Sequence, residues 1–192
     1  MNNSSEAWPP VPVEPAEPHP KAPESGSELP EHYAECFGCG EQQPAGLHLR
    51  STVGDHMHVH SRFLVTEAHQ GAPGLAHGGL LACAFDEALG TAVGNLLQQP
   101  AVTGRLETDF RKPVPVGSTL YIDAALDGTA GRKIYATASG RLDSPDGPVA
   151  VSAHALFVVV GFDHFASHGD TDAVAKLSDG NGTAGRQWDI NP

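Results

Sequence analysis

Basic residues are scarce in this sequence. Eleven Lys and Arg stand against 23 Asp and Glu among 192 residues, so the formal net charge is −12. A protein that binds nucleic acid needs a basic surface, and this charge balance therefore disfavours DNA or RNA as a partner. The acid excess is uneven, because residues 1–35 carry −6, residues 163–192 carry −3, and residues 36–162 carry the remaining −3.

Cysteine is scarce as well. Cys36, Cys39 and Cys83 are too few for a disulfide framework, which favours a reducing, cytoplasmic location. The first residues lack the positive patch and apolar run of a secretory signal, so none is expected there. A search for uninterrupted apolar runs of about 18 residues finds none, and no membrane-spanning segment is expected.

Proline and acidic residues dominate the start of the chain, for example in 8-WPPVPVEPAEPHP-20. A segment with so little apolar surface cannot offset the entropy lost on ordering. We therefore expect residues 1–34 to be disordered or extended, and the first 30 to be dispensable for thermal stability. Residues 35–162 form the expected domain, and residues 163–192 form a polar C-terminal tail.

Between the tails, apolar and polar residues alternate in six segments that we expect to be strands. One long apolar segment, roughly Gly78 to Leu97, is expected to be a helix and precedes the last four strands. This order predicts an α+β fold with an antiparallel sheet. Because the helix is apolar nearly all round, the sheet must curve around it. The expected strands lie near residues 46–52, 56–65, 101–112, 117–128, 131–142 and 148–160.

Two acids interrupt the apolar helix in 76-AHGGLLACAFDEALGTAVG-94, at Asp86 and Glu87. A buried carboxylate costs several kcal/mol unless it is paired, so such an acid is either a structural partner or a functional group. The two side chains lie about 100° apart around a helix and cannot share one environment. We expect Asp86 to be functional and Glu87 to lie at the rim or in an ion pair.

His77, Gly78 and Gly79 open the helix. Their backbone N–H groups and the helix dipole could polarise a carbonyl oxygen, as in an oxyanion hole, although a tight turn also explains two glycines. Gly78 and Asp86 are eight residues apart, which is about 12 Å along a helix. Reacting groups must come within about 3–3.5 Å, so one site that uses both has to be built across a dimer.

The order His77-Gly78-Gly79, then Asp86 and Gly90, resembles the hotdog-fold acyl-CoA thioesterases of the PaaI type. The resemblance covers about residues 36–160. It implies a hotdog fold, in which a curved antiparallel sheet wraps one central helix, and assembly as homodimers or dimers of dimers. It also implies hydrolysis of acyl-CoA to a free acid and coenzyme A without a cofactor. A closer likeness to the thioesterase superfamily member 4 branch is found in 70-QGAPGLAHGG-79, 103-TGRLETDFRKPVPVG-117, 131-GRK-133 and 154-HALFVVV-160.

The resemblance also implies roles for single residues. Asp86 matches the catalytic carboxylate, as general base or nucleophile, and the Gly78 N–H matches the group that polarises the thioester carbonyl. Thr103 matches a hydroxyl that helps to orient water. His77 is the motif histidine and is expected to shape the turn.

Further residues are expected to contact substrate. Some relatives place an asparagine where Gly71 stands here, so Gln70 becomes the candidate for positioning water, and Gly79 lies beside the oxyanion donor. Basic pairs are plausible partners for the phosphates of coenzyme A. These pairs are Arg111 with Lys112 and Arg132 with Lys133.

Cys36 and Cys39 have the spacing of zinc ligands, but a structural zinc needs four ligands and no second pair follows. We therefore expect these cysteines to serve packing and turn formation, with no metal. Two other functions remain open, a hotdog hydratase or dehydratase and a non-catalytic acyl-CoA-binding protein. A hydratase would place a histidine along the helix, and none follows His77.

Overall fold

The computed structural model describes residues 7–171 and residue 174. Seven strands form one antiparallel sheet in the order β1-β2-β3-β7-β8-β9-β6. The strand bounds are β1 (Glu28–Leu29), β2 (Arg50–Val53), β3 (His58–Leu64), β7 (Thr119–Ala130), β8 (Lys133–Leu142), β9 (Val149–Val159) and β6 (Ala101–Phe110). Strands β1 and β6 therefore form the two edges of the sheet.

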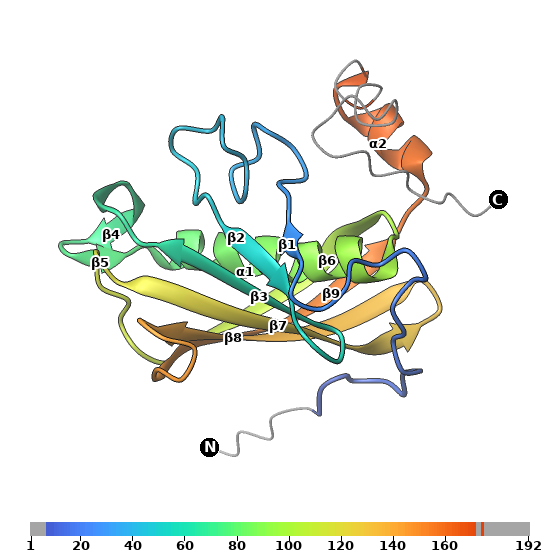
Figure 1. The fold of residues 1–192 in the computed structure, drawn as a ribbon, viewed down its shortest axis with the longest axis horizontal. Helices are drawn as coiled ribbons and strands as arrows, with labels where there is room; N and C mark the ends of the chain where they lie inside the picture. Colours follow the sequence, from blue (N-terminus) through green and yellow to red (C-terminus); the bar gives the residue numbers. More distant parts are fainter. Residues whose placement is uncertain (1–6, 172–173, 175–192) are drawn as a thin grey trace.

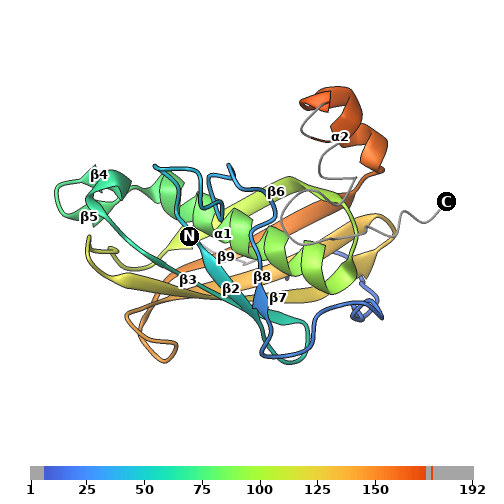
Figure 2. The ribbon, with the colours of Figure 1, turned by 45° about the horizontal axis from the view of Figure 1, so that its top comes forward.

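One long helix, α1 (Gly78–Ala92), lies across one face of the twisted sheet (Figures 1 and 2). It continues into a π-helical turn, η2 (Val93–Leu97). The helix packs on β3, β6, β7, β8 and β9. Phe85 and Leu89 on this helix are fully buried, as are Leu120 and Ile122 on β7 opposite. The expected α+β fold with one central helix is thus confirmed, since five strands give the apolar helix a surface to bury against.

The stretch Gly78–Leu97 is 20 residues long and apolar enough to cross a membrane, so the expectation that no such stretch exists is wrong. Counting uninterrupted apolar residues missed it, because Asp86 and Glu87 break the run while its average remains apolar. In the folded chain this stretch is the core helix, and 56% of its 18-residue apolar window is buried. The core helix of a folded domain can have the same length and mean hydropathy as a membrane span. These two properties are therefore weak evidence that the helix crosses a membrane.

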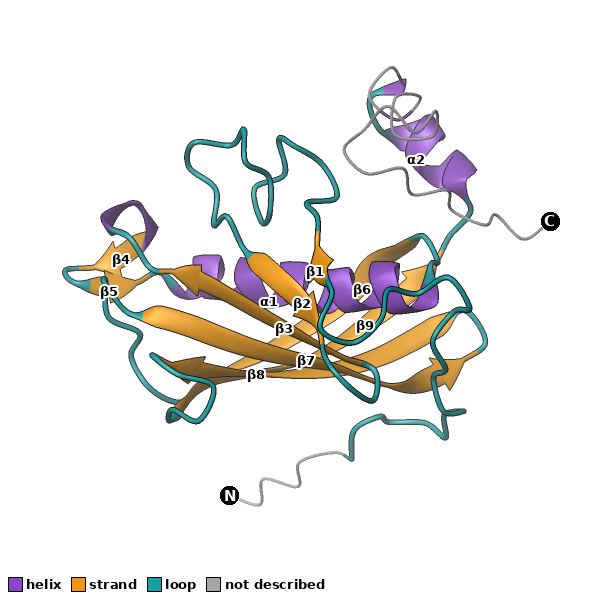
Figure 3. Cartoon of the chain, viewed as in Figure 1, coloured by secondary structure: helices purple, strands orange, loops and turns teal. Residues whose placement is uncertain are grey.

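All six expected strands are present, most with shorter ends, although β2 and β7 extend past their expected last residues (Figure 3). The short elements were not predicted. β1 has two residues, too few for a pattern, and the hairpin of β4 (Gln70–Ala72) and β5 (Leu75–Ala76) follows a single turn, η1 (Glu67–His69). The C-terminal tail begins with a short helix, α2 (Phe162–His168), that projects from one end of the domain (Figure 1). Residues 172–173 and 175–192 of that expected tail lie outside the described residues.

The proline-rich N-terminal segment is extended, and it lies on the domain. Glu14 N–H donates to the Thr129 carbonyl at 2.8 Å, and Thr129 N–H donates back to Glu14 at 2.9 Å. Gly128 has a φ of 155°, and a Cβ there would lie 2.6 Å from the Glu14 carbonyl oxygen. Only glycine therefore lets β7 and this segment approach so closely.

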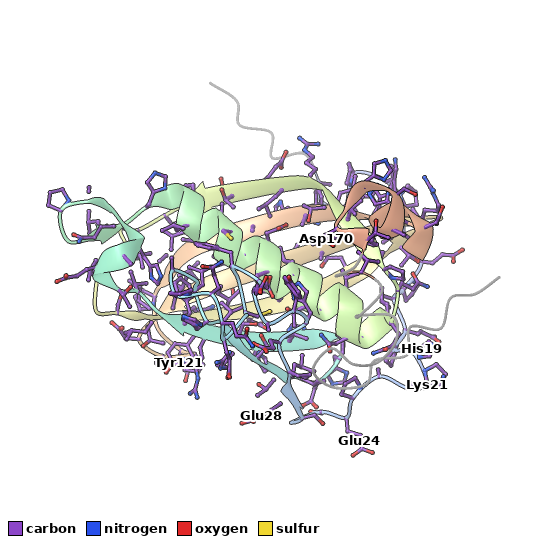
Figure 4. All side chains as sticks on the ribbon, turned by 90° about the horizontal axis from the view of Figure 1, so that it is seen from above. His19, Lys21, Glu24, Glu28, Tyr121 and Asp170 are labelled. Carbon is purple, nitrogen blue, oxygen red and sulfur yellow. The ribbon has the colours of Figure 1, made fainter. Side chains whose placement is uncertain are left out.

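The segment then runs along one side of the molecule to the sheet. His19, Lys21, Glu24 and Glu28 mark its path in Figure 4. β1 pairs with β2, and Leu29 is buried. The sheet therefore begins at residue 28, before the expected domain boundary at residue 35.

Trp8 anchors the segment on the face of the sheet that α1 does not cover. Its ring stacks on His154 at 5.0 Å between centroids and meets Tyr135 edge-on at 5.5 Å. Its indole N–H donates a 3.0 Å hydrogen bond to Asp127. Tyr135 is only 2% exposed although it alternates along β8 with the core residues Ile134 and Ala136, so the N-terminal segment covers part of the outer face.

These contacts argue against the expectation that the first 30 residues are dispensable, which an unfolding measurement would test. Trp8→Ala should lower the free energy of unfolding by about 1–3 kcal/mol, because aromatic pairs and hydrogen bonds to charged groups each contribute on that scale. Each kcal/mol corresponds to roughly 2–4 °C in Tm for a chain of this size. Thermal unfolding followed by circular dichroism measures the change. Val11→Ala, in the same segment and 41% exposed, is the matched control. An unchanged Tm in Trp8→Ala would show that the segment contributes no stability.

Candidate active site

Asp86 lies in the middle of α1 and faces the edge strand β6. The Thr103 hydroxyl donates a 2.7 Å hydrogen bond to Asp86 Oδ1. Burial raises the pKa of the Asp86 carboxyl, the bond from Thr103 opposes this rise, and the charge of Glu87 adds to it. In the described part of the chain no hydrogen bond occupies Asp86 Oδ2. This oxygen is therefore available to water or to a substrate.

The start of α1 presents a backbone donor. His77 is the N-cap residue, and its Nδ1 accepts a 2.9 Å hydrogen bond from Gly79 N–H. The Gly78 N–H has no hydrogen-bond partner among residues 7–171 and 174. A Cβ at Gly78 would lie 3.5 Å from the Phe110 ring, which places this amide beside the end of β6. His77 thus caps the helix start and accepts the hydrogen bond of the Gly79 N–H. The Gly78 N–H remains available as a donor.

The β4–β5 hairpin precedes this helix start. A Cβ at Gly71 would lie 2.7 Å from His77 Cα, so the asparagine that some relatives place here would not fit without a shift of the hairpin. The Gln70 side-chain oxygen accepts a 2.7 Å bond from Gly74 N–H, and its NH2 group donates to the Glu67 carbonyl at 3.3 Å. Both ends of the Gln70 amide hold the hairpin, so positioning water would require these bonds to break.

Glu87 points to the other side of α1, toward the loop of residues 30–49 that joins β1 and β2. Its side chain is 12% exposed, and His32 Nδ1 lies 3.3 Å from Glu87 Oε1. The Cys36 thiol donates to Glu87 Oε2 at 3.4 Å. The nearby Cys36 side chain and the Glu87 carboxylate raise the pKa of His32 to about 10. Of the two expectations for Glu87, the structure therefore places it in an ion pair and not at the rim.

Comparison with known proteins agrees with this fold and arrangement. Residues 73–146 match the family model described as the thioesterase superfamily. Acyl-coenzyme A thioesterase THEM4 from Bos taurus is 39% identical over 72 residues, which is 38% of this chain and 29% of that protein. Among solved structures, the E. coli PaaI protein superposes with a TM-score of 0.55 at 18% identity, covering 60% of this chain and 81% of that one. The smu.793 protein from Streptococcus mutans, bound to acetyl CoA, gives 0.53 at 20% identity, covering 58% and 87%.

Residues 73–146 are thus similar to the thioesterase superfamily, and the domain has the hotdog fold of the solved thioesterases. The expected PaaI-type domain and its likeness to the member 4 branch are confirmed. The two structural likenesses, both under 25% identical, concern the fold alone. The chain matches less than a third of the length of the curated relative from Bos taurus.

The two basic pairs of this hotdog domain lie at opposite ends of the sheet. Arg111 and Lys112 directly follow β6. Arg132 and Lys133 lie at the β7–β8 turn, and the Arg132 carbonyl accepts a bond from Val159, which pairs with the first residue of β6. The ten residues of β6 therefore separate the pairs, by about 30 Å at roughly 3.3 Å per residue. A single chain does not bring them to one substrate.

Sequence reasoning missed two residues, one beside Gly78 and one beside Glu87. Phe110 is 52% exposed and meets the start of α1, and its position at the end of a strand that precedes a basic pair was a usable signal. His32 reaches Glu87 from 55 positions away, and no local pattern could have found it.

The capping bond of His77 has a measurable contribution. His77→Ala should lower the free energy of unfolding by about 1 kcal/mol, because loss of an N-cap acceptor leaves the Gly79 N–H unsatisfied. His77→Asn should recover most of this loss, since asparagine is a good N-cap residue. Urea unfolding of the three proteins measures the effect. If the alanine variant were as stable as the wild type, the bond would have no stabilising role.

Proposed function

We propose that this protein hydrolyses acyl-CoA thioesters to a free acid and coenzyme A, with Asp86 as the reacting carboxylate. The observation that carries the proposal is this half-buried acid, which Thr103 holds by one oxygen at the edge strand of a thioesterase-superfamily domain. The relative from Bos taurus is named acyl-coenzyme A thioesterase, and the Streptococcus mutans structure contains acetyl CoA. Hydrolysis of a thioester needs only water and groups that this chain supplies.

Asp86 can act by two routes. As general base, Oδ2 takes a proton from water while the water oxygen attacks the thioester carbonyl, the C–S bond breaks, and the proton passes to the leaving thiolate. As nucleophile, Oδ2 attacks the carbonyl itself, the thiolate leaves, and water then cleaves the mixed anhydride. A single turnover in oxygen-18 water separates the routes, because label enters Asp86 only by the second.

The Gly78 N–H is the proposed oxyanion donor. The carbonyl oxygen gains negative charge in either route, and a free N–H at a helix N-terminus stabilises such charge. Gly78 and Asp86 of one chain cannot serve the same carbonyl, since about 12 Å of helix separates them.

A dimer could bring Gly78 of one chain close to Asp86 of the other. β6 is an edge strand of ten residues, and Phe110 at its end is 52% exposed. If two β6 strands paired antiparallel about a two-fold axis, the start of one would lie beside the end of the other. Thr103 and Asp86 of one chain would then approach Gly78 of the other.

The same pairing would gather positive charge. Arg132 and Lys133 lie near the start of β6, and Arg111 and Lys112 lie at its end. Antiparallel pairing therefore brings one pair from each chain to the same end of the joint sheet, where both could bind the phosphates of coenzyme A.

A hydratase is disfavoured by the residues around Asp86. Hydration of an enoyl-CoA in hotdog enzymes uses an acid and a histidine, and α1 contains no histidine after its N-cap His77. A purely binding domain would have no need of a desolvated carboxylate, because burial costs free energy and gives a neutral thioester no charge to pair with.

Asp86→Asn should lower the turnover number for acyl-CoA hydrolysis by a factor on the order of 10² or more, which is the typical contribution of a positioned acid–base group. The fold should survive, since the change is nearly isosteric and removes a buried charge. Release of free thiol from short, medium, long and aromatic acyl-CoAs measures the loss. Asp146→Asn, the same change at an exposed turn, is the control. A substrate that the Asp86→Asn protein hydrolyses at the wild-type rate would rule out this carboxylate.

The shared site can be tested by complementation in mixed dimers. Gly78→Pro removes the N–H, and proline suits this first helical position because His77 already has an extended backbone with φ −73° and ψ 130°. Asp86→Asn and Gly78→Pro homodimers should both be nearly inactive. A mixed dimer has one doubly defective site and one intact site, so it should recover about half of the wild-type activity.

Two controls make this result decisive. Gly78→Ala keeps the N–H and adds a Cβ that meets only ordinary contacts, so its homodimer should remain active. Melting curves must show that the mixed dimer, purified through two different tags, is folded. A folded mixed dimer as inactive as its parents would place both groups in one chain.

A further inference from the structure

Four side chains with metal-binding atoms meet on the side of α1 that faces the β1–β2 loop. They are His32, Cys36, Cys39 and Glu87, and one ligand atom from each lies within 4.8 Å of all the others. Seen from above, side chains of this loop lie against α1 (Figure 4). Asp86 faces β6, so this cluster is separate from the proposed active site.

We propose that His32, Cys36, Cys39 and Glu87 form a structural zinc site. The sequence analysis expected no metal because only the two cysteines were visible as ligands. Folding supplies the third and fourth ligands, one just after β1 and one from the middle of α1. Two thiolates and an imidazole favour zinc over magnesium or calcium, and a carboxylate completes a tetrahedral set.

The separations fit a tetrahedral ion. With metal–ligand bonds of about 2.0–2.3 Å, ligand atoms at the corners of a tetrahedron lie about 3.3–3.8 Å apart. The Cys39 sulfur lies 3.1 Å from His32 Nδ1, which in turn lies 3.3 Å from Glu87 Oε1. The Cys36 sulfur lies 3.4 Å from Glu87 Oε2. The other separations are at most 4.8 Å, so rotations of side chains would have to bring all four ligands to bonding distance.

Glu87 supplies independent support. Its Oε1 atom is buried and has no hydrogen-bond partner, and the approach of His32 at 3.3 Å does not have the geometry of a hydrogen bond. An unsatisfied carboxylate oxygen in a buried position costs free energy. A cation at the centre of the cluster would satisfy this oxygen, whereas a disulfide between the two cysteines would leave it unsatisfied.

Two glycines of the 30–49 loop allow close packing around the proposed zinc site. A Cβ at Gly38 would lie 2.5 Å from Cγ and Cδ of Glu87, so a larger residue there would displace this carboxylate from its present position. The Gly38 N–H donates to the Cys36 sulfur at 3.2 Å, a bond that orients a thiolate ligand. A Cβ at Gly40 would lie 2.5 Å from Cys36 N, which explains the second glycine of Cys36-Phe37-Gly38-Cys39-Gly40.

The site would stabilise the fold and take no part in the chemistry. Four protein ligands leave zinc no open position for water, which is the mark of a structural centre. Three ligands belong to the 30–49 loop and one to α1, so the ion would fasten this loop over the helix. The side chain of His32 is 49% exposed, which leaves a path for the ion to enter.

The test uses the full-length protein, purified in reduced form, and does not depend on thioesterase activity. Mass spectrometry of the metal content should find about one zinc per chain, or the metal-free protein should take up one Zn²⁺. Titration with Co²⁺ should produce the thiolate charge-transfer absorption and the intense visible bands of a tetrahedral site. Removal of zinc with a chelator should lower Tm, because the folded state binds the metal more tightly than the unfolded chain.

Variants assign the ligands. Cys36→Ala and Cys39→Ala should abolish stoichiometric zinc, and His32→Ala and Glu87→Gln should weaken zinc binding at least about tenfold. Cys83→Ala is the matched control, since Cys83 lies on α1 one turn before Glu87 and is not in the cluster. The Zn²⁺ and Co²⁺ titrations of the wild-type protein test whether the site binds metal even if a variant fails to fold.

Three results would overturn the proposal. The first is a reduced wild-type protein that binds neither Zn²⁺ nor Co²⁺ with a stoichiometry of one. The second is zinc that remains after both Cys36 and Cys39 are replaced. The third is a Cys36–Cys39 disulfide as the form in which the metal-free protein is most stable, which would identify a redox pair.

Discussion

The arrangement of this domain depends on the cost of burying two adjacent carboxylates in an apolar helix. Each needs a polar partner, and successive side chains on a helix point about 100° apart, so no single neighbour can satisfy both. Asp86 finds the Thr103 hydroxyl on β6, and Glu87 finds His32 and Cys36 in the β1–β2 loop. The edge strand β6 therefore lies beside Asp86 on one side of α1. The polar β1–β2 loop covers Glu87 on the other side.

The edge position of β6 explains why, under the proposed mechanism, one chain would make only part of a catalytic site. Asp86 contacts the start of this strand through Thr103, and Gly78 contacts its end through Phe110. The groups that could attack a carbonyl and polarise it are thus placed at the two ends of one strand. Since none of the described residues pairs with the outer edge of β6, a second copy of the strand is the simplest way to bring such groups together.

Much of this fold could be predicted from the sequence, because α1 and strands β2, β3 and β6–β9 show strong apolar periodicity. Asp86 and His77 could also be singled out as candidates, since an acid in an apolar helix and a His-Gly-Gly start are visible locally. The packing of the extended N-terminal segment on the sheet could not be predicted, because it relies on Trp8, one side chain in a run of prolines. The partners of Trp8 are Tyr135, Asp127 and His154, from three strands distant in sequence. The composition of a segment indicates how much apolar surface it has. It does not show whether a single side chain, such as that of Trp8, packs on another part of the fold.

Glu87 also illustrates how the two sides of α1 constrain each other. A deletion or insertion of one residue between Gly78 and Asp86 would turn both acids by about 100°. Asp86 would lose Thr103, and Glu87 would leave the loop that packs against it at Gly38. The polar cluster around Glu87 therefore fixes the rotation of α1 about its axis, and with it the direction in which Asp86 points. A residue that takes no part in hydrolysis would in this way determine the geometry of the one that does.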